Sequence, residues 1–256
     1  MTISGDFRAR LLAGDFVAGC WLNLGSPVTA EMAGLAGFDW VLLDHEHGPG
    51  SEETILHQLQ AASATPAVPL VRIATNDPAR FKRVLDAGAH GVMVPYISTP
   101  AEAQAVVNAM RYQPRGIRGV AKLTRASGFG ARFDEYYTHA HEWLVTIPQV
   151  ETAEAVQNAA AIAAIDGVDV LFIGPMDLSV SLGVPGDYLH PRCQEAWTHV
   201  ASVARAAGKA AGILLADPAH VAICRRLGFT FIALGSDGSA VLAGIQKNIG
   251  VLRASP

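Results

Sequence analysis

Short apolar stretches rich in Val, Ile and Leu recur along the chain, and each is followed by a longer, Ala-rich amphipathic stretch. Near-continuous apolar runs of this kind are typical of strands that are buried on both faces of a parallel sheet. We count eight, at residues 17–23, 40–44, 69–73, 91–95, 144–150, 169–173, 211–215 and 230–234. Their alternation with helical stretches predicts βα units and therefore an α/β fold.

Capping signals mark the helices between these runs. Helix starts are indicated at Ser51-Glu52-Glu53, Asp77-Pro78, Thr99-Pro100-Ala101-Glu102 and Asp217-Pro218, and helix ends at Gly88, Gly208 and Gly228. Two segments, 111–141 and 183–192, interrupt the rhythm, and long connections within a compact domain are often functional. The 256 residues match one (β/α)₈ barrel of roughly 250 residues, so we expect a single TIM barrel domain over 1–256.

Composition narrows the class of protein. Half of the residues are hydrophobic and 16% are charged, which suits a large core, and a net charge of −4 without a basic stripe argues against nucleic acid as a partner. Cys20, Cys193 and Cys224 are few and widely spaced, so we expect reduced thiols in a cytoplasmic protein. Residues 1–10 lack a signal-peptide core and no apolar run reaches the ~20 residues that span a bilayer, so we expect no membrane association.

Polar residues that end the apolar runs are the candidates for chemistry, because barrels of this kind place their active sites at the carboxyl ends of the strands. The second run ends in Asp44-His45-Glu46-His47. An acid beside a histidine there has the form of a general base, His45, with Asp44 as its orienting carboxylate. The alternative is a helix N-cap beside a solvent-facing histidine.

Arg72 lies inside the third apolar run, where a charged side chain is costly to bury unless it is paired. Alternation along the strand permits it to point into the barrel. Its planar guanidinium suits a substrate carboxylate or an enolate oxygen. The alternative is an internal ion pair that holds the top of the barrel.

Two further carboxylates follow the fifth and sixth runs. Gln149 and Glu151 share one face of their strand, and Asp177 follows the next strand, so Glu151 and Asp177 can approach one another. Two carboxylates with water and a substrate oxygen suit a hard cation such as Mg²⁺ or Mn²⁺, whereas separate acids at helix N-termini are the alternative. Gly174-Pro175 leads into a short helix whose backbone N–H groups can face an anion.

These residues occur within motifs that together resemble the HpcH/HpaI aldolase family, the class II pyruvate aldolases. The motifs are 19–23 (GCWLN), 39–49 (DWVLLDHEHGP), 69–73 (PLVRI), 91–95 (GVMVP), 118–119 (RG), 149–152 (QVET) and 174–179 (GPMDLS). They follow one another in the family's order from about residue 15 to 240. The resemblance implies a (β/α)₈ barrel and a reversible cleavage of 4-hydroxy-2-oxo acids to pyruvate, or hydroxypyruvate, and an aldehyde.

The resemblance also implies a role for each residue. Glu151 and Asp177 would bind a divalent metal, Mg²⁺, Mn²⁺ or Co²⁺, which would hold the 2-oxo acid and stabilise its enolate as a Lewis acid. Arg72 would stabilise that enolate, His45 would move a proton, Gln149 would position the oxo acid, and the backbone after Gly174 would contact its carboxylate. The family further implies a homo-oligomer, commonly a hexamer whose subunits exchange the C-terminal helix, here about 236–253.

Lysine usage supports a metal route independently. A class I aldolase needs a Schiff-base lysine, and none of the four lysines, Lys82, Lys122, Lys209 and Lys247, ends a candidate strand.

Two alternatives stay open: a citryl- or malyl-thioester lyase, which would need a coenzyme A pocket, and a non-catalytic barrel that binds an oxo acid. Candidates for the pocket wall are Trp21, Phe172 and Leu214, with core packing as the alternative, and candidates for the aldehyde are Arg118, Lys122, Arg125 and Phe129 of loop 111–141. The alternative for Arg118 is a structural ion pair with an acid.

Overall fold

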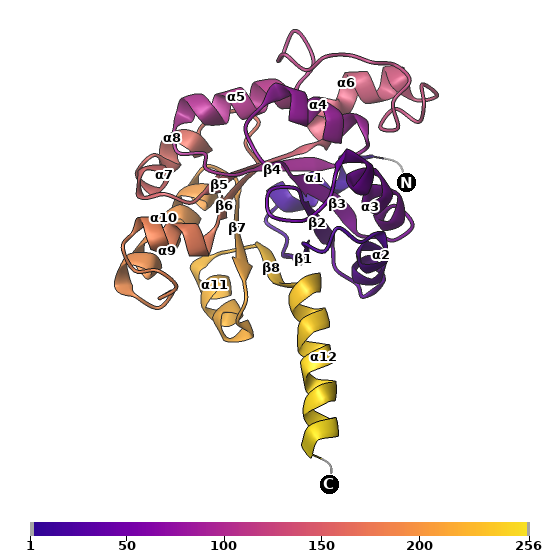
Figure 1. Cartoon of the computed structure of the whole chain (residues 1–256). Coiled ribbons are helices and arrows are strands. Elements are labelled where there is room, and N and C mark those ends of the chain that lie inside the picture. The colour runs from indigo at the N-terminus through magenta and orange to yellow at the C-terminus, as the bar shows by residue number, and fades with distance from the viewer. Residues whose placement is uncertain (1–2, 255–256) are drawn as a thin grey trace.

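A computed structural model of the chain describes residues 3–254 and contains a closed, eight-stranded parallel barrel, β1 to β8, in sequence order (Figure 1). The strands are β1 (Val17–Leu22), β2 (Trp40–Asp44), β3 (Val68–Arg72), β4 (Gly91–Val94), β5 (Val145–Val150), β6 (Val170–Ile173), β7 (Ala210–Leu215) and β8 (Phe231–Ser236). Pairing of β8 with β1 closes the barrel. All eight predicted strands are confirmed, and their ends differ from the predicted ones by at most two residues.

Helices follow the strands and surround the barrel. They are α1 (Asp6–Leu12), α2 (Pro27–Leu35), α3 (Glu52–Ala62), α4 (Pro78–Asp86), α5 (Pro100–Met110), α6 (Phe133–Trp143), α7 (Ala153–Gln157), α8 (Ala159–Ala163), α9 (Pro175–Ser181), α10 (Pro191–Ala206), the short 3₁₀ helix η1 (Pro218–His220), α11 (Val221–Leu227) and α12 (Asp237–Ala254). The predicted starts are confirmed: Thr99 and Glu102 form a reciprocal capping box, and Asp77 and Asp217 cap their own helices.

The barrel interior is filled by alternate side chains of the strands. Trp40 of β2 stacks on Phe231 of β8 with ring centroids 4.0 Å apart, and Trp40 and Leu42 are fully buried there. A side chain at Gly19 would overlap the Trp40 ring, so glycine makes room for that stack. Because successive strand residues point to opposite faces, Asp44 continues the inward-facing row of Trp40 and Leu42.

The long segment 111–141 is an irregular loop that ends in α6. Arg118 is buried in it, donates to Asp86 at 2.8 Å and to the hydroxyl of Tyr136 at 3.1 Å, and lies over the Tyr112 ring. Arg118 therefore forms a structural ion pair, which was the alternative to a role in binding the aldehyde. Arg125 likewise donates to the backbone carbonyl of Ala87.

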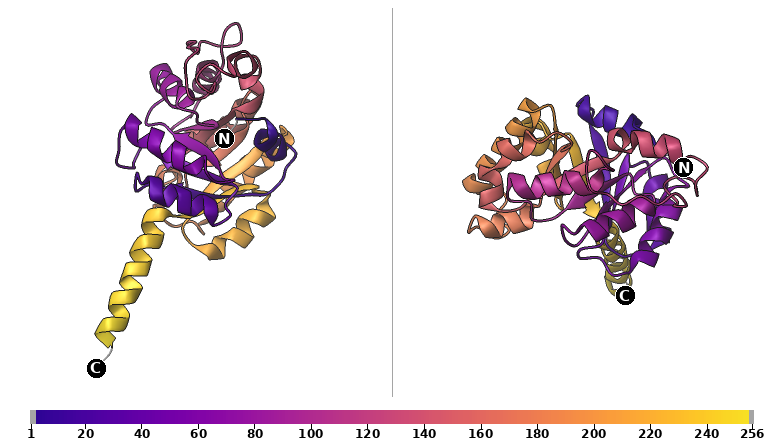
Figure 2. Two further views of the ribbon diagram at one scale, coloured as in Figure 1. Left: turned by 90° about the vertical axis from the view of Figure 1, so that its right-hand side faces the viewer. Right: turned by 90° about the horizontal axis from the view of Figure 1, so that it is seen from above.

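Helix α12 projects away from the barrel in all three views (Figures 1 and 2). Its first residue, Asp237, is buried and accepts hydrogen bonds from the backbone N–H of Asn23 and the hydroxyl of Thr29, at 2.8 and 2.6 Å. Beyond this anchor its apolar side chains are exposed. None of the helices in the described part of the chain is long and apolar enough to cross a membrane. Cys20, Cys193 and Cys224 are buried, unpaired thiols.

Candidate active site

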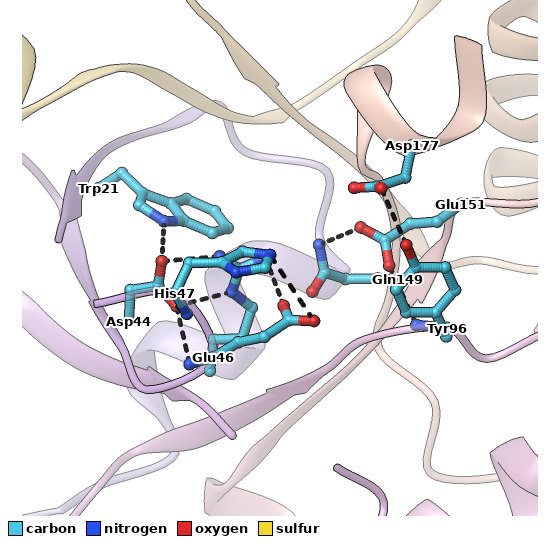
Figure 3. Close-up of polar contacts among 9 residues, drawn as sticks. Trp21, Asp44, Glu46, His47, Tyr96, Gln149, Glu151 and Asp177 are labelled. Atoms are coloured by element: carbon cyan, nitrogen blue, oxygen red, sulfur yellow. Dashed lines mark hydrogen bonds and ion pairs between the residues drawn. The ribbon is translucent and has the colours of Figure 1, made fainter. Parts of the chain in front are cut away.

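Polar side chains from β2, β3, β5 and α9 gather at the carboxyl end of the barrel (Figure 3). We call Asp44, Glu46, Arg72, Gln149, Glu151 and Asp177 the rim cluster. Five of these six were predicted from the sequence as residues that end apolar runs, and Glu46 was not. The structure brings them to one side of the barrel, because parallel strands end at a common edge.

Arg72 is held by two carboxylates. Its Nε and Nη2 donate to Oδ1 and Oδ2 of Asp44 at 2.9 and 2.7 Å, and its Nη1 lies 2.7 Å from Oε2 of Glu46. Asp44 and Arg72 occupy paired register positions of β2 and β3, which sets the two-point geometry. The guanidinium also lies 4.7 Å from the centroid of the Trp21 ring. The side chain is thus rigid and buried at the rim.

Asp44 accepts hydrogen bonds from groups other than a histidine ring. Besides Arg72, it accepts from Nε1 of Trp21 at 3.1 Å and from the backbone N–H groups of Glu46 and His47 at 3.0 and 3.2 Å. Burial alone would raise the pKa of Asp44, but these hydrogen bonds and the Arg72 charge bring it below its ordinary value. Asp44 is therefore an ionised partner of Arg72 and orders the turn that carries Glu46 and His47.

The two histidines of this turn point in different directions. His45 follows Asp44 directly, so alternation places it on the outer face of β2, and the charges that act on it are those of Asp44 and of Arg80 and Glu52 at the starts of α4 and α3. Its Nε2 is buried and has no hydrogen-bond partner among the described residues, and burial lowers the pKa of His45. The His47 ring is exposed beside Glu46 at the rim (Figure 3). His47, which sequence reasoning did not single out, is the imidazole that the fold presents to the rim cluster.

Glu151 is almost wholly buried, with 2% of its surface exposed. Its Oε1 accepts from the amide of Gln149 at 3.0 Å, and its Oε2 from the backbone N–H of Tyr96 at 3.0 Å. A side chain at Gly174 would overlap its carboxylate, so glycine is needed there for space. Burial, with the charges of Asp177 and Glu46, raises the pKa of Glu151 to about 7.

Asp177 lies in the first turn of α9, and its Oδ1 accepts from the Tyr96 hydroxyl at 2.8 Å. This hydrogen bond, with burial, raises the pKa of Tyr96 to about 12, so the phenol is the donor. Burial and the charges of Asp44 and Asp177 also raise the pKa of Glu46, although Arg72 and His47 oppose that rise. Neighbouring carboxylate charges thus contribute to the raised pKa of both Glu46 and Glu151, and such an environment favours a bound cation.

The residues present fit a divalent cation with oxygen ligands. In the described part of the chain no three His, Cys, Asp or Glu side chains are placed to hold a metal together. Glu151 and Asp177 would therefore supply two ligands, and substrate and water the others, as Mg²⁺ commonly accepts. The buried Oε1 of Gln149 has no hydrogen-bond partner among residues 3–254 and can receive a hydrogen bond from a ligand.

Apolar side chains surround this polar cluster. Trp21 and Phe172 point into the barrel with ring centroids 5.8 Å apart. Leu214 and Pro175 line a cavity of about 120 Å³ beside α9, together with Tyr188. A larger cavity of about 720 Å³ lies between α3, α4 and loop 111–141, and no residue of the rim cluster lines it. The residues able to carry out chemistry therefore lie at the rim and not in this larger cavity.

The four lysines lie away from the rim cluster, as the sequence predicted. Lys82 is on α4, Lys122 in loop 111–141 and Lys247 on α12, and Lys209 precedes β7 at the opposite end of the barrel. Lys122 lies 5.8 Å from the centroid of the Phe133 ring. A Schiff-base mechanism would need an amine at the carboxyl ends of the strands.

Known proteins resemble the chain over nearly its whole length. The profile of the family described as HpcH/HpaI aldolase/citrate lyase matches residues 17–243. The 5-keto-4-deoxy-D-glucarate aldolase of Salmonella paratyphi C (strain RKS4594) is 42% identical over 241 residues, which are 94% of each chain.

Two solved structures agree with this match. An HpcH/HpaI aldolase/citrate lyase family protein from Burkholderia cenocepacia J2315 has a TM-score of 0.93 at 38% identity, covering 98% of this chain and 100% of that one. An HpcH/HpaI aldolase from Desulfitobacterium hafniense DCB-2 has a TM-score of 0.91 at 29% identity, covering 97% of both. The Salmonella and Desulfitobacterium relatives are named aldolases, which are carbon–carbon lyases. This chain therefore belongs to the HpcH/HpaI aldolase/citrate lyase family and is a carbon–carbon lyase of the aldolase kind.

Proposed function

We propose that this protein is a divalent-metal-dependent aldolase that reversibly cleaves 4-hydroxy-2-oxo acids to pyruvate, or hydroxypyruvate, and an aldehyde. The observation that carries the proposal is the pairing of Glu151 and Asp177, joined through Tyr96, beside the buried guanidinium of Arg72. This pairing offers a cation site next to a fixed positive charge. The unpaired buried thiols favour a reducing compartment, so we infer a cytoplasmic enzyme.

The name of the Salmonella relative supports this substrate class. Counted from its keto end, 5-keto-4-deoxy-D-glucarate is a 2-oxo acid with a CH₂ group at carbon 3 and a hydroxyl at carbon 4. Cleavage between carbons 3 and 4 yields the three-carbon 2-oxo acid pyruvate and an aldehyde that carries the second carboxylate. Acidic keto-deoxy sugars are therefore the first substrates to test.

The proposed cation is Mg²⁺, Mn²⁺ or Co²⁺, held by Glu151 and Asp177. When bound, it would supply Lewis-acid stabilisation of the negative charge that develops on the 2-oxo oxygen. Arg72 would add a preorganised charge at the same oxygen, since Asp44 and Glu46 fix its plane. The carboxylate of the oxo acid would then lie toward Gly174 and Pro175, where α9 begins.

Gln149 and His47 have the remaining proposed roles, contact with the substrate and proton transfer. Gln149 donates its amide to Glu151 and leaves its Oε1 for the substrate. Cleavage must remove the proton of the 4-hydroxyl group, and His47 stands at the open side of the rim cluster where it can take it. The role expected for His45 stays a prediction, but its outward position favours His47 for proton transfer.

We further propose a homohexamer in which subunits exchange α12. Leu242, Ile245, Ile249 and Leu252 recur at helical spacing on this projecting helix and are all exposed. Val28, Met32 and Leu35 form a second exposed apolar stripe along α2, which packs against β1 and β2. A helix after β8 would ordinarily cover this side of the barrel, so the partner's α12 is the occupant that fits.

The aldehyde would contact a neighbouring subunit through loop 111–141. Among the described residues no contact joins Lys122, Arg125 or Phe129 to the rim cluster of the same chain. Leu123 and Phe129 of this loop are nevertheless 78% and 71% exposed. An oligomer would cover them.

The proposal is tested by pyruvate release from 4-hydroxy-2-oxo acids, with EDTA and then with restored Mg²⁺ or Mn²⁺. We expect activity to vanish with chelator, to return with metal and to fall at least 100-fold in Glu151→Gln. The matched control is Glu154→Gln, the same change at an exposed position three residues further on. Activity that is indifferent to chelator and to Glu151→Gln would refute the metal site.

Two alternative functions are separated by further assays of the same protein. A thioester lyase would cleave citryl- or malyl-coenzyme A and leave the free hydroxy-oxo acids intact. A non-catalytic barrel would bind pyruvate without metal-dependent exchange of its methyl protons for deuterium, because binding alone removes no proton. Exchange without coenzyme A would favour the aldolase over both.

A further inference from the structure

Tyr96 has an unusual backbone. It follows Pro95 at the end of β4 and has φ = 53°, in the left-handed region that non-glycine residues seldom adopt. Tyr96 and Phe129 are the two non-glycine residues with positive φ in the described part of the chain. Such strain persists only where the surroundings hold it, and it is concentrated at functional sites.

The strained conformation aims both the backbone and the side chain of Tyr96 at the rim cluster. Its N–H donates to Oε2 of Glu151 at 3.0 Å, and its hydroxyl donates to Oδ1 of Asp177 at 2.8 Å (Figure 3). One residue of the β4–α5 turn thus reaches the end of β5 and the start of α9. It joins three successive βα units at the two carboxylates.

The turn that carries Tyr96 is itself fixed to the neighbouring strand end. The N–H of Ile97 donates to the carbonyl of Gln149 at 3.1 Å, and the hydroxyls of Ser98 and Thr152 lie 2.8 Å apart. Asn158 donates to the carbonyl of Ser98 at 2.8 Å. Because this turn is tied to β5 and to the segment after it, the Tyr96 donors have a fixed position relative to Glu151.

We propose that Tyr96 is a positioning residue of the cation site: its N–H orients Glu151, and its phenol holds Asp177 in the rotamer that faces Glu151. The inference rests on the proposed function, since it assumes that these carboxylates hold the metal. Asp177 is half-buried on a seven-residue helix, and Tyr96 is the side chain that hydrogen-bonds its carboxylate. Without the phenol, the Asp177 side chain would sample other rotamers before binding.

The role predicts a defect in metal binding and not in folding. Hydrogen-bond partners that orient metal ligands typically contribute about 10- to 100-fold to metal affinity. We expect Tyr96→Phe, which removes one oxygen and keeps the ring and the backbone N–H, to weaken Mn²⁺ binding by about 10-fold. The bond between Tyr96 and Glu151 is made by the backbone and survives this change.

The test is titration of metal-free protein with Mn²⁺, with free Mn²⁺ measured by electron paramagnetic resonance. Tyr137→Phe is the matched control, because Tyr137 also has one hydrogen bond, to the carbonyl of Gln113, and lies on α6 away from the rim. We expect wild type and Tyr137→Phe to bind alike and Tyr96→Phe to bind more weakly. Equal or tighter binding by Tyr96→Phe would overturn the inference.

Turnover at varied Mn²⁺ separates positioning from structural damage. In Tyr96→Phe the Mn²⁺ concentration for half-maximal activity should rise while kcat at saturating Mn²⁺ stays near that of wild type. A lowered kcat at saturation together with a lowered melting temperature would instead indicate damage and would count against the inference. Absence of Mn²⁺ binding by wild type would refute the proposed metal site itself, so the two failures are distinguishable.

Discussion

Arg72 and Asp44 meet edge to edge at paired register positions of β3 and β2, with Nε–Oδ1 and Nη2–Oδ2 distances of 2.9 and 2.7 Å. Both side chains are buried, so the pair is shielded from water. The two alternatives for Arg72, internal ion pair and ligand for an oxyanion, are therefore compatible. Asp44 holds one edge of the guanidinium, and the fixed plane defines where its positive charge is presented.

Breaking this pair should impair both stability and activity. Asp44→Asn keeps the volume of the side chain but leaves the Arg72 charge with Glu46 as its remaining carboxylate partner. Removing one member of a buried ion pair typically destabilises a protein by about 3 kcal/mol or more. We expect that loss in urea unfolding, and a fall in kcat/KM on the order of 100-fold from misplacement of Arg72.

Glu135→Gln is the control for Asp44→Asn. It breaks the exposed pair of Glu135 with Arg132, and exposed pairs contribute about 0–1 kcal/mol. If both variants unfolded at the same urea concentration as wild type, the buried pair would have no structural role.

Substitution of His45 and His47 tests which histidine transfers the proton. The sequence predicted His45, whereas the geometry favours His47. His47→Asn should lower kcat by about 10²- to 10⁴-fold, the usual range for loss of a general acid–base group. His45→Asn should retain most of the activity, because strand alternation directs His45 away from the inward-facing Asp44 and the rim cluster. Retro-aldol rates at saturating metal provide the measurement. The reverse ranking would restore His45 as the base.

Much of the fold follows from the sequence because continuous apolar runs have few alternatives to buried parallel strands. Arg72 and Glu151 could be recognised since each is a charged residue at the end of such a run. Because successive strand residues point to opposite faces, His45 points away from the face that carries Asp44. Its outward direction could therefore have been predicted from the sequence. Tyr96 could not be found in this way, because no residue pattern predicts a positive φ at a tyrosine or its contact with Asp177.

Glu151 should lower the stability of the metal-free protein, although it serves the proposed function. Its pKa in the folded protein is about 7, against an ordinary value of 4.5, and this difference corresponds to about 3 kcal/mol. Between pH 4.5 and 7 the folded protein retains a proton that the unfolded chain loses, so wild-type stability falls as pH rises through this window. Without metal, Glu151→Gln should therefore be the more stable protein above pH 7.

The measurement is urea unfolding of both proteins in EDTA from pH 4.5 to 8. The advantage of Glu151→Gln should be small at pH 4.5, grow as pH rises and level off above about pH 7. A constant difference across the range would show that burial of the Glu151 charge does not set its pKa. Exposed Glu154→Gln should show no such trend.

The exposed apolar face of α12 should control assembly. Ile245 lies in the middle of the stripe formed with Leu242, Ile249 and Leu252. If a partner subunit covers this stripe, Ile245→Glu places a charge in an apolar interface, where an unpaired charge is strongly unfavourable. We expect sedimentation velocity to show dissociation of the proposed hexamer to smaller species, and activity to fall if loop 111–141 of a neighbour completes the site.

Ala243→Glu adds the same charge two residues earlier, which is the opposite face of the helix. It should leave the assembly intact, because this face would remain in solvent when α12 packs by its apolar stripe. Dissociation by both variants would point to a helix that is buried on all sides, and dissociation by neither would place the subunit interface elsewhere. Dissociation by Ile245→Glu alone is the result that an exchanged, amphipathic α12 requires.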